Sequence, residues 1–225
     1  ALVVYYCSFV VKGGCMVAQE CKCIPVRQTL VRMRKSGLED ALGQNTFDTY
    51  IAKEPWQERI KKTAINFLED YQGNWFFIGG QVGAGKTHIC TALVGEFINR
   101  GYAAKYMLWK DEATKLKSVV NDADSYEPLM YELKTIPVLY IDDFFKTSLD
   151  DRGNRVPPTQ GDINLAFEIL NYRYNQNKIT IISSEMTIRE LIACDEAVGS
   201  RIFQRTKKYQ LSLSKDQNKN QRLKE

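Results

Sequence analysis

The sequence has 225 residues, of which 44% are hydrophobic and 26% charged, and its net charge is +4. This length predicts one large domain, or a medium domain with a small appendage, and the hydrophobic content allows a real core. The mild charge permits an acidic partner without requiring one, and the absence of any run of about eighteen apolar residues excludes a transmembrane helix.

Residues 1–26 form a small segment in which four of the six cysteines lie close together. In an intracellular setting, metal binding by such a cluster is favoured over disulfides. The candidate zinc ligands are Cys7, Cys15, Cys21 and Cys23. The alternative is the remnant of a zinc ribbon. Its other ligands would lie in an N-terminal part that we expect to be missing, because the sequence starts without Met.

Residues 27–50 are basic, then mixed in charge, and are interpreted as a linker with a short helix. An amphipathic helix is predicted at 54–72, with Pro55 near its first turn. It opens the main domain, predicted at 51–225, in which strands and helices alternate. Apolar runs and helical spacing predict strands at 75–79, 103–109, 138–145, 178–185 and 209–214, and helices at 87–99, 110–122, 126–136, 162–176 and 187–206.

This alternation predicts the α/β class, with a parallel sheet flanked by helices on both faces. One long irregular piece, residues 146–162, interrupts it. We expect this piece to be a mobile loop that a partner could order.

The segment IGGQVGAGKTHICTAL, which starts at Ile78, contains the full spacing of a phosphate-binding loop, from Gly80 to Thr87. A predicted strand precedes the loop and a predicted helix follows it, as the motif requires. Glycines let backbone N–H groups reach phosphate oxygens, and the start of the helix adds partial positive charge. Lys86 can reach the β- and γ-phosphates, and the Thr87 hydroxyl can coordinate Mg²⁺. The residues expected to bind the nucleotide are Gly80, Gly83, Ala84, Gly85, Lys86, Thr87 and His88.

The strand VLYIDDFF, residues 138–145, ends in two carboxylates. Ligands of parallel sheets bind at the C-terminal ends of the strands, which puts both carboxylates beside the phosphates. Asp142 fits the residue that holds Mg²⁺, and Asp143 fits the group that orients or activates the attacking water. The alternative is a solvated acidic turn.

Two further segments carry candidate catalytic groups. The strand at 178–185 ends in Ser184 and Glu185, either of which could contact the γ-phosphate or the water. Arg201 and Arg205 lie four residues apart on one predicted helix, and one of them could complete a neighbouring subunit's site. The alternative is that these arginines form ordinary surface ion pairs.

The segments GQVGAGKTHICTAL, VLYIDDFF, TIISSEMTIREL and GSRIFQR, taken in this order, resemble the AAA+ ATPases that load the bacterial replicative helicase (DnaC/DnaI-type loaders), phage members included. AQECKC and the basic stretch after it resemble the region between the zinc ribbon and the ATPase core of these loaders. The resemblance implies a bacterial cytoplasmic protein that binds ATP and Mg²⁺ between the subunits of a homo-oligomer. It also implies contact with the hexameric replicative helicase and with single-stranded DNA.

The resemblance also assigns roles to individual residues. The glycine loop matches Walker A, and Asp142 and Asp143 match Walker B. Arg205 matches the arginine finger better than Arg201, and Arg222 lies where a late arginine senses nucleotide. Three departures stand out: Asp143 replaces the usual Glu, which suggests slow ATP hydrolysis; Ser184-Glu185 replaces a Thr-Asn or Ser-Asn pair; and no first cysteine pair is present.

The leading hypothesis is therefore an ATP-hydrolysing helicase loader. A transposition helper ATPase with the same core is the second. A small-molecule P-loop kinase is the third, and it would use Arg152 and Arg155 in a lid over the acceptor.

Overall fold

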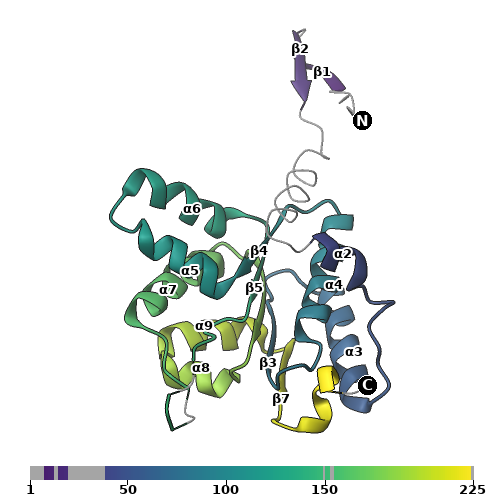
Figure 1. Ribbon diagram of the computed structural model, residues 1–225. Coiled ribbons are helices and arrows are strands. Elements are labelled where there is room, and N and C mark those ends of the chain that lie inside the picture. Colours follow the sequence, from purple (N-terminus) through teal and green to yellow (C-terminus); the bar gives the residue numbers. More distant parts are fainter. Residues whose placement is uncertain (1–7, 13–14, 20–38, 149, 153–154, 224–225) are drawn as a thin grey trace.

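The computed structural model describes residues 8–12, 15–19, 39–148, 150–152 and 155–223. Its main body is a parallel sheet with the strand order β4-β5-β6-β3-β7 (Figure 1). The strands are β3 (Phe76–Gly80), β4 (Ala104–Leu108), β5 (Val138–Asp142), β6 (Ile179–Ser184) and β7 (Gln210–Leu213). The predicted α/β class, with a parallel sheet between helices, is confirmed.

Helices cover both faces of the sheet (Figure 1). One face carries α2 (Glu39–Gln44), α3 (Pro55–Glu69) and α4 (Lys86–Asn99). The other carries α5 (Trp109–Ser118), α6 (Ala123–Thr135), α7 (Gln160–Asn175), α8 (Ile188–Cys194) and α9 (Glu196–Thr206).

The alternation of side chains along β3 explains why both faces are covered. Phe76 and Ile78 point into the core beneath α3 and α4, whereas Trp75 and Phe77 point into the core beneath α5 to α9. All four side chains are buried. A strand that is apolar on both faces needs a helical layer on each.

The order of the strands positions the candidate site. β6 lies between β3, which leads into the glycine loop, and β5, which carries the paired carboxylates. Because all the strands are parallel, their C-terminal ends meet at one edge of the sheet.

Two features differ from the sequence-based elements. β5 ends at Asp142 and not at Phe145, because Asp143 and Phe145 have positive φ angles of 52° and 53° and turn the chain. Phe144 and Phe145 are nevertheless fully buried and stack with their ring centroids 4.1 Å apart. They contact Trp109 at 4.9 and 5.4 Å. Their apolar character thus reflects burial in a turn and not in a strand.

The second difference concerns the predicted linker at 27–50. In its described part, α2 packs against α4, and Tyr50 is only 6% exposed within the core. Residues 39–50 therefore pack on the same body as the rest of the ATPase domain predicted at 51–225.

The N-terminal segment contains an antiparallel hairpin, β1 (Ser8–Lys12) paired with β2 (Cys15–Gln19). Cys7, Cys21 and Cys23 lie outside the described residues, and only the backbone of Cys15 is described. Zinc binding by these cysteines therefore stays a prediction. Within the described ranges, no group of three or more His, Cys, Asp or Glu side chains is arranged to hold a metal ion.

Among the residues that the structure describes, none of the helices combines the length and the hydropathy that crossing a bilayer requires. The chain ends in two short 3-10 helices, η1 (Gln217–Lys219) and η2 (Gln221–Leu223). They follow β7 and return towards the glycine loop, where the backbone N–H of Gln221 donates to the Gly83 carbonyl at 2.9 Å.

Candidate functional site

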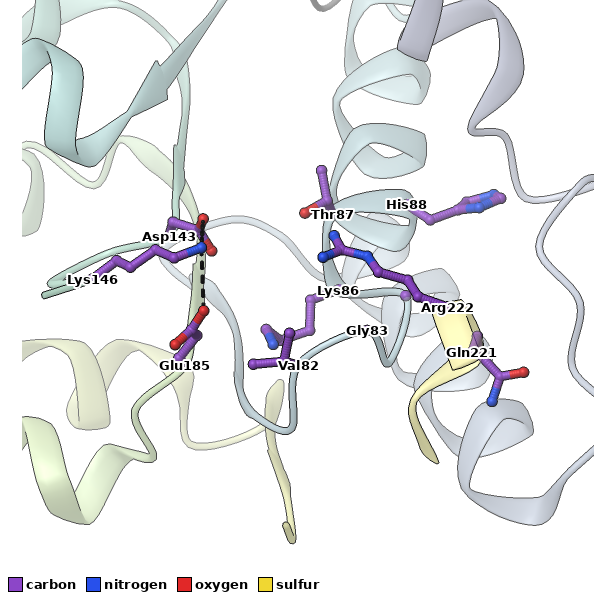
Figure 2. A pocket seen from close by; sticks show the side chains of 11 residues that line it. Val82, Gly83, Lys86, Thr87, His88, Asp143, Lys146, Glu185, Gln221 and Arg222 are labelled. Atoms are coloured by element: carbon purple, nitrogen blue, oxygen red, sulfur yellow. Dashed lines mark hydrogen bonds and ion pairs between the residues drawn. The ribbon is translucent and has the colours of Figure 1, made fainter. Parts of the chain in front are cut away.

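A cavity of about 310 Å³ opens where β3, β5 and β6 end (Figure 2). The glycine loop and the start of α4 form one wall, and the turn after β5 and the end of β6 form the other. The C-terminal segment closes the cavity on the side of the glycine loop. The lining residues are Val82, Gly83, Gly85, Lys86, Thr87, His88, Asp143, Lys146, Glu185, Gln221 and Arg222.

The glycine loop has the backbone geometry that its sequence predicts. Gly80, Gly83 and Gly85 have φ angles of 102°, 72° and 77°, which side chains rarely allow. A Cβ atom on Gly80 would lie 2.0 Å from the carbonyl oxygen of Leu213, and one on Gly83 would lie 1.9 Å from Oδ1 of Asn220. Gly85 caps the N-terminus of α4. The loop is therefore a cradle for an anion at a helix N-terminus.

Lys86 lies at the start of this helix and is only 7% exposed. Its Nζ donates to the carbonyls of Gly80 at 2.9 Å and Gln81 at 2.7 Å. Burial lowers the pKa of the Lys86 ammonium, while the carboxylates of Glu185, Asp143 and Asp142 oppose the shift. The carbonyls of Gly80 and Gln81 thus hold the Lys86 ammonium group beside the cavity.

Asp142 is buried at the end of β5 and is surrounded by hydrogen-bond donors. The Thr87 hydroxyl lies 3.4 Å from both of its carboxylate oxygens. Ser183 Oγ and Tyr106 Oη also donate to it, the latter at 3.2 Å, as does the backbone N–H of Asp143 at 3.0 Å. Burial, and the negative charge of Asp142, raise the pKa of the Tyr106 phenol. A hydroxyl and a carboxylate this close together are oxygen donors that fit Mg²⁺.

The opposite wall is a chain of ion pairs. Asp143 Oδ2 lies 2.7 Å from Lys146 Nζ, which lies 3.2 Å from Glu185 Oε1. Glu185 Oε2 in turn lies 3.0 Å from Arg155 Nη2. Burial tends to raise the pKa of Glu185, but hydrogen bonds from Arg155 and Lys146 outweigh it and lower that pKa. Figure 2 shows Asp143, Lys146 and Glu185 gathered on one side of the cavity, opposite Lys86 and Arg222.

The end of β6 separates its two serines. Ser183 faces Asp142, whereas the Ser184 hydroxyl donates to the Phe144 carbonyl at 2.7 Å and accepts from the N–H of Met186 at 3.0 Å. Successive residues of a strand point to opposite faces. The structure therefore brings Ser183 and Glu185, and not Ser184, to the site.

The two arginines of α9 are held within their own chain. Arg205 donates to the carbonyls of Gly73, at 2.8 Å, and Tyr174, and its guanidinium lies 4.3 Å from the Tyr174 ring centroid. Arg201 donates to Asn171 Oδ1 at 3.0 Å and lies over the Phe167 ring at 4.8 Å. Neither lines the cavity of its own chain.

The same helix contains a close contact that its sequence motif does not reveal. A Cβ atom on Gly199 would lie 2.6 Å from the backbone N and Cα of Ile192 on α8. Gly199 thus lets α9 pack directly on the backbone of α8.

Of the remaining predicted residues, Arg222 and His88 lie at the cavity and Ala84 does not. Arg222, on η2, lines it, and so does His88, whose Nε2 lies 3.0 Å from the Thr46 carbonyl oxygen. The His88 ring also packs edge-on against Tyr50 at 5.2 Å, which supports a packing role. Ala84 is buried in the core and does not line the cavity.

Sequence reasoning missed Tyr106, Ser183, Lys146 and the contacts of Thr46 and Tyr50 with His88. A signal existed for Lys146, which lies four residues after Asp142. The position of Tyr106 depends on the pairing of β4 with β5, in which Leu108 lies beside Asp142, and no local sequence pattern indicates this pairing.

A family model described as "IstB-like ATP binding protein" matches residues 6–224. The uncharacterized protein YqaM of Bacillus subtilis (strain 168) is 28% identical over 201 residues, which cover 85% of this chain and 62% of YqaM. The phage-like element PBSX protein XkdC of the same strain is 29% identical over 214 residues, which cover 88% of this chain and 78% of XkdC. The chain therefore spans less than two thirds of the length of YqaM.

A solved structure titled "Crystal structure of the DnaC helicase loader" superposes with a TM-score of 0.61 and 22% sequence identity, over 76% of this chain and 97% of that chain. At this identity the likeness concerns the fold.

Proposed function

Since this chain belongs to the family of IstB-like ATP-binding proteins, we propose that it is an ATP-hydrolysing helicase loader that delivers a replicative DNA helicase onto single-stranded DNA. One observation carries the ATPase part of the proposal. Thr87, at the end of the glycine loop, lies 3.4 Å from the carboxylate of Asp142, at the tip of a strand two positions away in the sheet. The glycine loop and a carboxylate suited to a metal ion therefore lie side by side at the edge of the sheet.

The glycine loop, the two aspartates and Arg222 have distinct roles in this proposal. The glycine loop and Lys86 bind the phosphates of ATP, and Thr87 and Asp142 hold Mg²⁺. Bound Mg²⁺ would neutralise phosphate charge. Asp143 accepts the proton of the attacking water, and Arg222 contacts the nucleotide from the C-terminal segment. Asp143 is a shorter base than Glu, so we expect slow ATP hydrolysis.

Arg205 is the proposed arginine finger. Arg205 would act on ATP bound to a neighbouring subunit of a homo-oligomer. Its guanidinium already contacts two carbonyls and an aromatic ring. A role in the neighbouring subunit therefore requires Arg205 to leave the carbonyls of Gly73 and Tyr174 when subunits assemble.

The loader role is supported by the order of the motifs, and the DnaC loader shares the fold. The family description favours a second candidate, a transposition helper ATPase. The two differ in partner and in DNA. A loader binds a hexameric helicase and responds to single-stranded DNA, whereas a helper binds a transposase and responds to duplex DNA.

The test compares the wild type with Lys86→Ala and with Lys62→Ala, an exposed lysine on α3 that serves as the control. We expect Lys86→Ala to lose binding of a fluorescent ATP analogue by about a hundredfold or more, because it removes a buried cation from the phosphate site. Release of inorganic phosphate should fall with it, and Lys62→Ala should match the wild type.

The same proteins are then used in a pull-down of the host's replicative helicase, with and without ATP. ATP-dependent capture by the wild type supports the loader role. Undiminished ATP binding by Lys86→Ala would contradict the ATPase assignment. Stimulation of hydrolysis by duplex DNA alone, without helicase capture, would favour the transposition helper.

A further inference from the structure

Lys146 is the central member of the ion-pair chain in the cavity wall. Its Nζ lies between the carboxylates of Asp143 and Glu185, at 2.7 and 3.2 Å. Among the described residues, Lys146 is the only side chain that forms an ion pair with Asp143, the proposed base. A carboxylate bound in this way has one oxygen occupied by the ammonium group, so that oxygen is not open to a water molecule.

The turn that carries Lys146 is anchored firmly. Phe144 and Phe145, directly before it, are fully buried against Trp109, and the N–H of Lys146 donates to the Asp143 carbonyl at 2.9 Å. The backbone of Lys146 is therefore fixed, while its side chain is 44% exposed and has room to move.

Glu185 does not depend on Lys146 alone. Arg155 pairs with its other oxygen at 3.0 Å, and the next residue, Val156, donates its N–H to the Ser148 carbonyl at 3.0 Å. If Lys146 left, Glu185 would keep a cationic partner but Asp143 would lose its own. The two carboxylates therefore respond differently to the same movement.

We propose that Lys146 distinguishes ATP from ADP: it pairs with Asp143 when no terminal phosphate is present, and it moves onto the γ-phosphate of bound ATP, which frees Asp143 as the base. This inference rests on the proposed ATPase function. A lysine suits the task, because its compact charge sits on a flexible stem with three donors. The terminal phosphate carries more negative charge than the Asp143 carboxylate and therefore draws the Lys146 ammonium group away from it.

The electrostatics of the cavity agree with this assignment. The hydrogen bond with Asp143 raises the pKa of Lys146, so the ammonium group is charged in this ion pair. Without the Lys146 ammonium group, the carboxylates of Asp143 and Glu185 would face the terminal phosphate of ATP and repel it. ADP has no group at this position and leaves the ion pair with Asp143 intact.

The test measures binding rather than turnover. Dissociation constants of a non-hydrolysable ATP analogue and of ADP are determined by calorimetry, with Mg²⁺, for the wild type, Lys146→Met and Lys146→Arg. The control is Lys134→Met, which breaks an ion pair with Glu168 on another part of the surface. We expect Lys146→Met to weaken the analogue at least about tenfold and ADP less than about twofold, as for loss of a charge-assisted hydrogen bond. Lys146→Arg should restore most of the preference, and Lys134→Met should keep all of it.

A second background separates a phosphate contact from simple neutralisation of charge. In Asp143→Asn the carboxylate no longer repels phosphate, so a Lys146 that served only as its counter-ion would lose its effect. We expect Lys146→Met to lower affinity for the analogue in this background too. Loss of the effect there, or an unchanged preference in Lys146→Met itself, would overturn the inference. A wild type that binds neither nucleotide would overturn the proposed function as well.

Discussion

The two walls of the cavity are built in different ways. The wall formed by the glycine loop depends on backbone conformation, with three glycines at positive φ and a lysine held by backbone carbonyls. The acidic wall depends on side chains from separate segments, joined as Asp143, Lys146, Glu185 and Arg155.

This difference separates what a local motif can encode from what only the fold assembles. A backbone cradle needs a few consecutive residues, so its sequence is a compact signature. An ion-pair chain draws on residues more than forty positions apart, and each of them alone is an ordinary surface charge. Substitutions in the glycine-loop wall should therefore act through backbone strain, and substitutions in the acidic wall should act through loss of charge.

The largest effect is expected from Gly80→Ala in the backbone wall. The new Cβ would overlap the Leu213 carbonyl oxygen at 2.0 Å, and the positive φ of 102° would be strained as well. Gly101→Ala is the matched control, because Gly101 has φ 87° and no atoms within 4 Å of its Cβ position. We expect Gly101→Ala to cost about 1 kcal/mol of unfolding free energy and Gly80→Ala about 3 kcal/mol or more. Urea denaturation measures both, and equal losses would show that strain alone, without the overlap, sets the cost.

An intermediate effect is expected from Asp142→Asn, at the junction of the two walls. The amide would place a donor among Thr87, Ser183 and the N–H of Asp143, all of which donate. In the wild type, Mg²⁺ should increase the affinity for an ATP analogue. We expect this increase to be at least about tenfold smaller in Asp142→Asn, because a carboxylate ligand is lost.

Tyr106→Phe is the control for this variant. It removes one hydrogen bond of 3.2 Å to Asp142 and keeps the carboxylate. We expect a change within about threefold, from the loss of one hydrogen bond of modest net strength. If both variants kept the full effect of Mg²⁺, Asp142 would not be a metal ligand.

The smallest effect is expected from Glu185→Gln in the acidic wall. Hydrogen bonds from Arg155 and Lys146 lower the pKa of Glu185, so its ion pairs stabilise the fold above the ordinary glutamate pKa of about 4.3 and lose this contribution as the pH falls further. We expect the wild type to exceed Glu185→Gln by about 1 kcal/mol or less at pH 7, and this difference to shrink towards zero on acidification. Denaturation curves at pH 7, 5 and 3.5 measure it, with Glu127→Gln, an exposed carboxylate on α6, as the control. A difference that stays constant with pH would assign it to packing.

Most of the fold was predictable because local patterns and the global fold agree. The apolar run before Gly80 and the helical spacing up to Gly101 gave β3 and α4 nearly to the residue. The order of the strands was not predictable, since no local pattern says that β6 lies between β3 and β5. Arg173 shows the same limit. It lies in a predicted helix but is fully buried, with its guanidinium donating to the carbonyls of Leu133, Ile136 and Ile179.

The candidate site could be predicted where its residues are consecutive in the sequence. The loop residues Gly83, Gly85, Lys86 and Thr87 line one cavity, as the motif implies, whereas the fold of the sheet brings Asp142 to Thr87. The choice of Ser184 depended on which face of β6 it occupies, and the alternation of the strand shifts that position to Ser183. Arg222 was named from the resemblance alone, and its segment reaches the glycine loop because β7 pairs with β3.

Gly199, the glycine of the GSRIFQR segment, affects how variants of α9 should be interpreted. Any side chain at position 199 would have to push α9 away from the backbone of Ile192, and both arginines of that helix would travel with it. A defect in such a variant would imitate the loss of an intersubunit contact without any change to a charged group. Genetic screens for assembly mutants would therefore collect lesions of interhelix spacing at this glycine alongside those at the arginines.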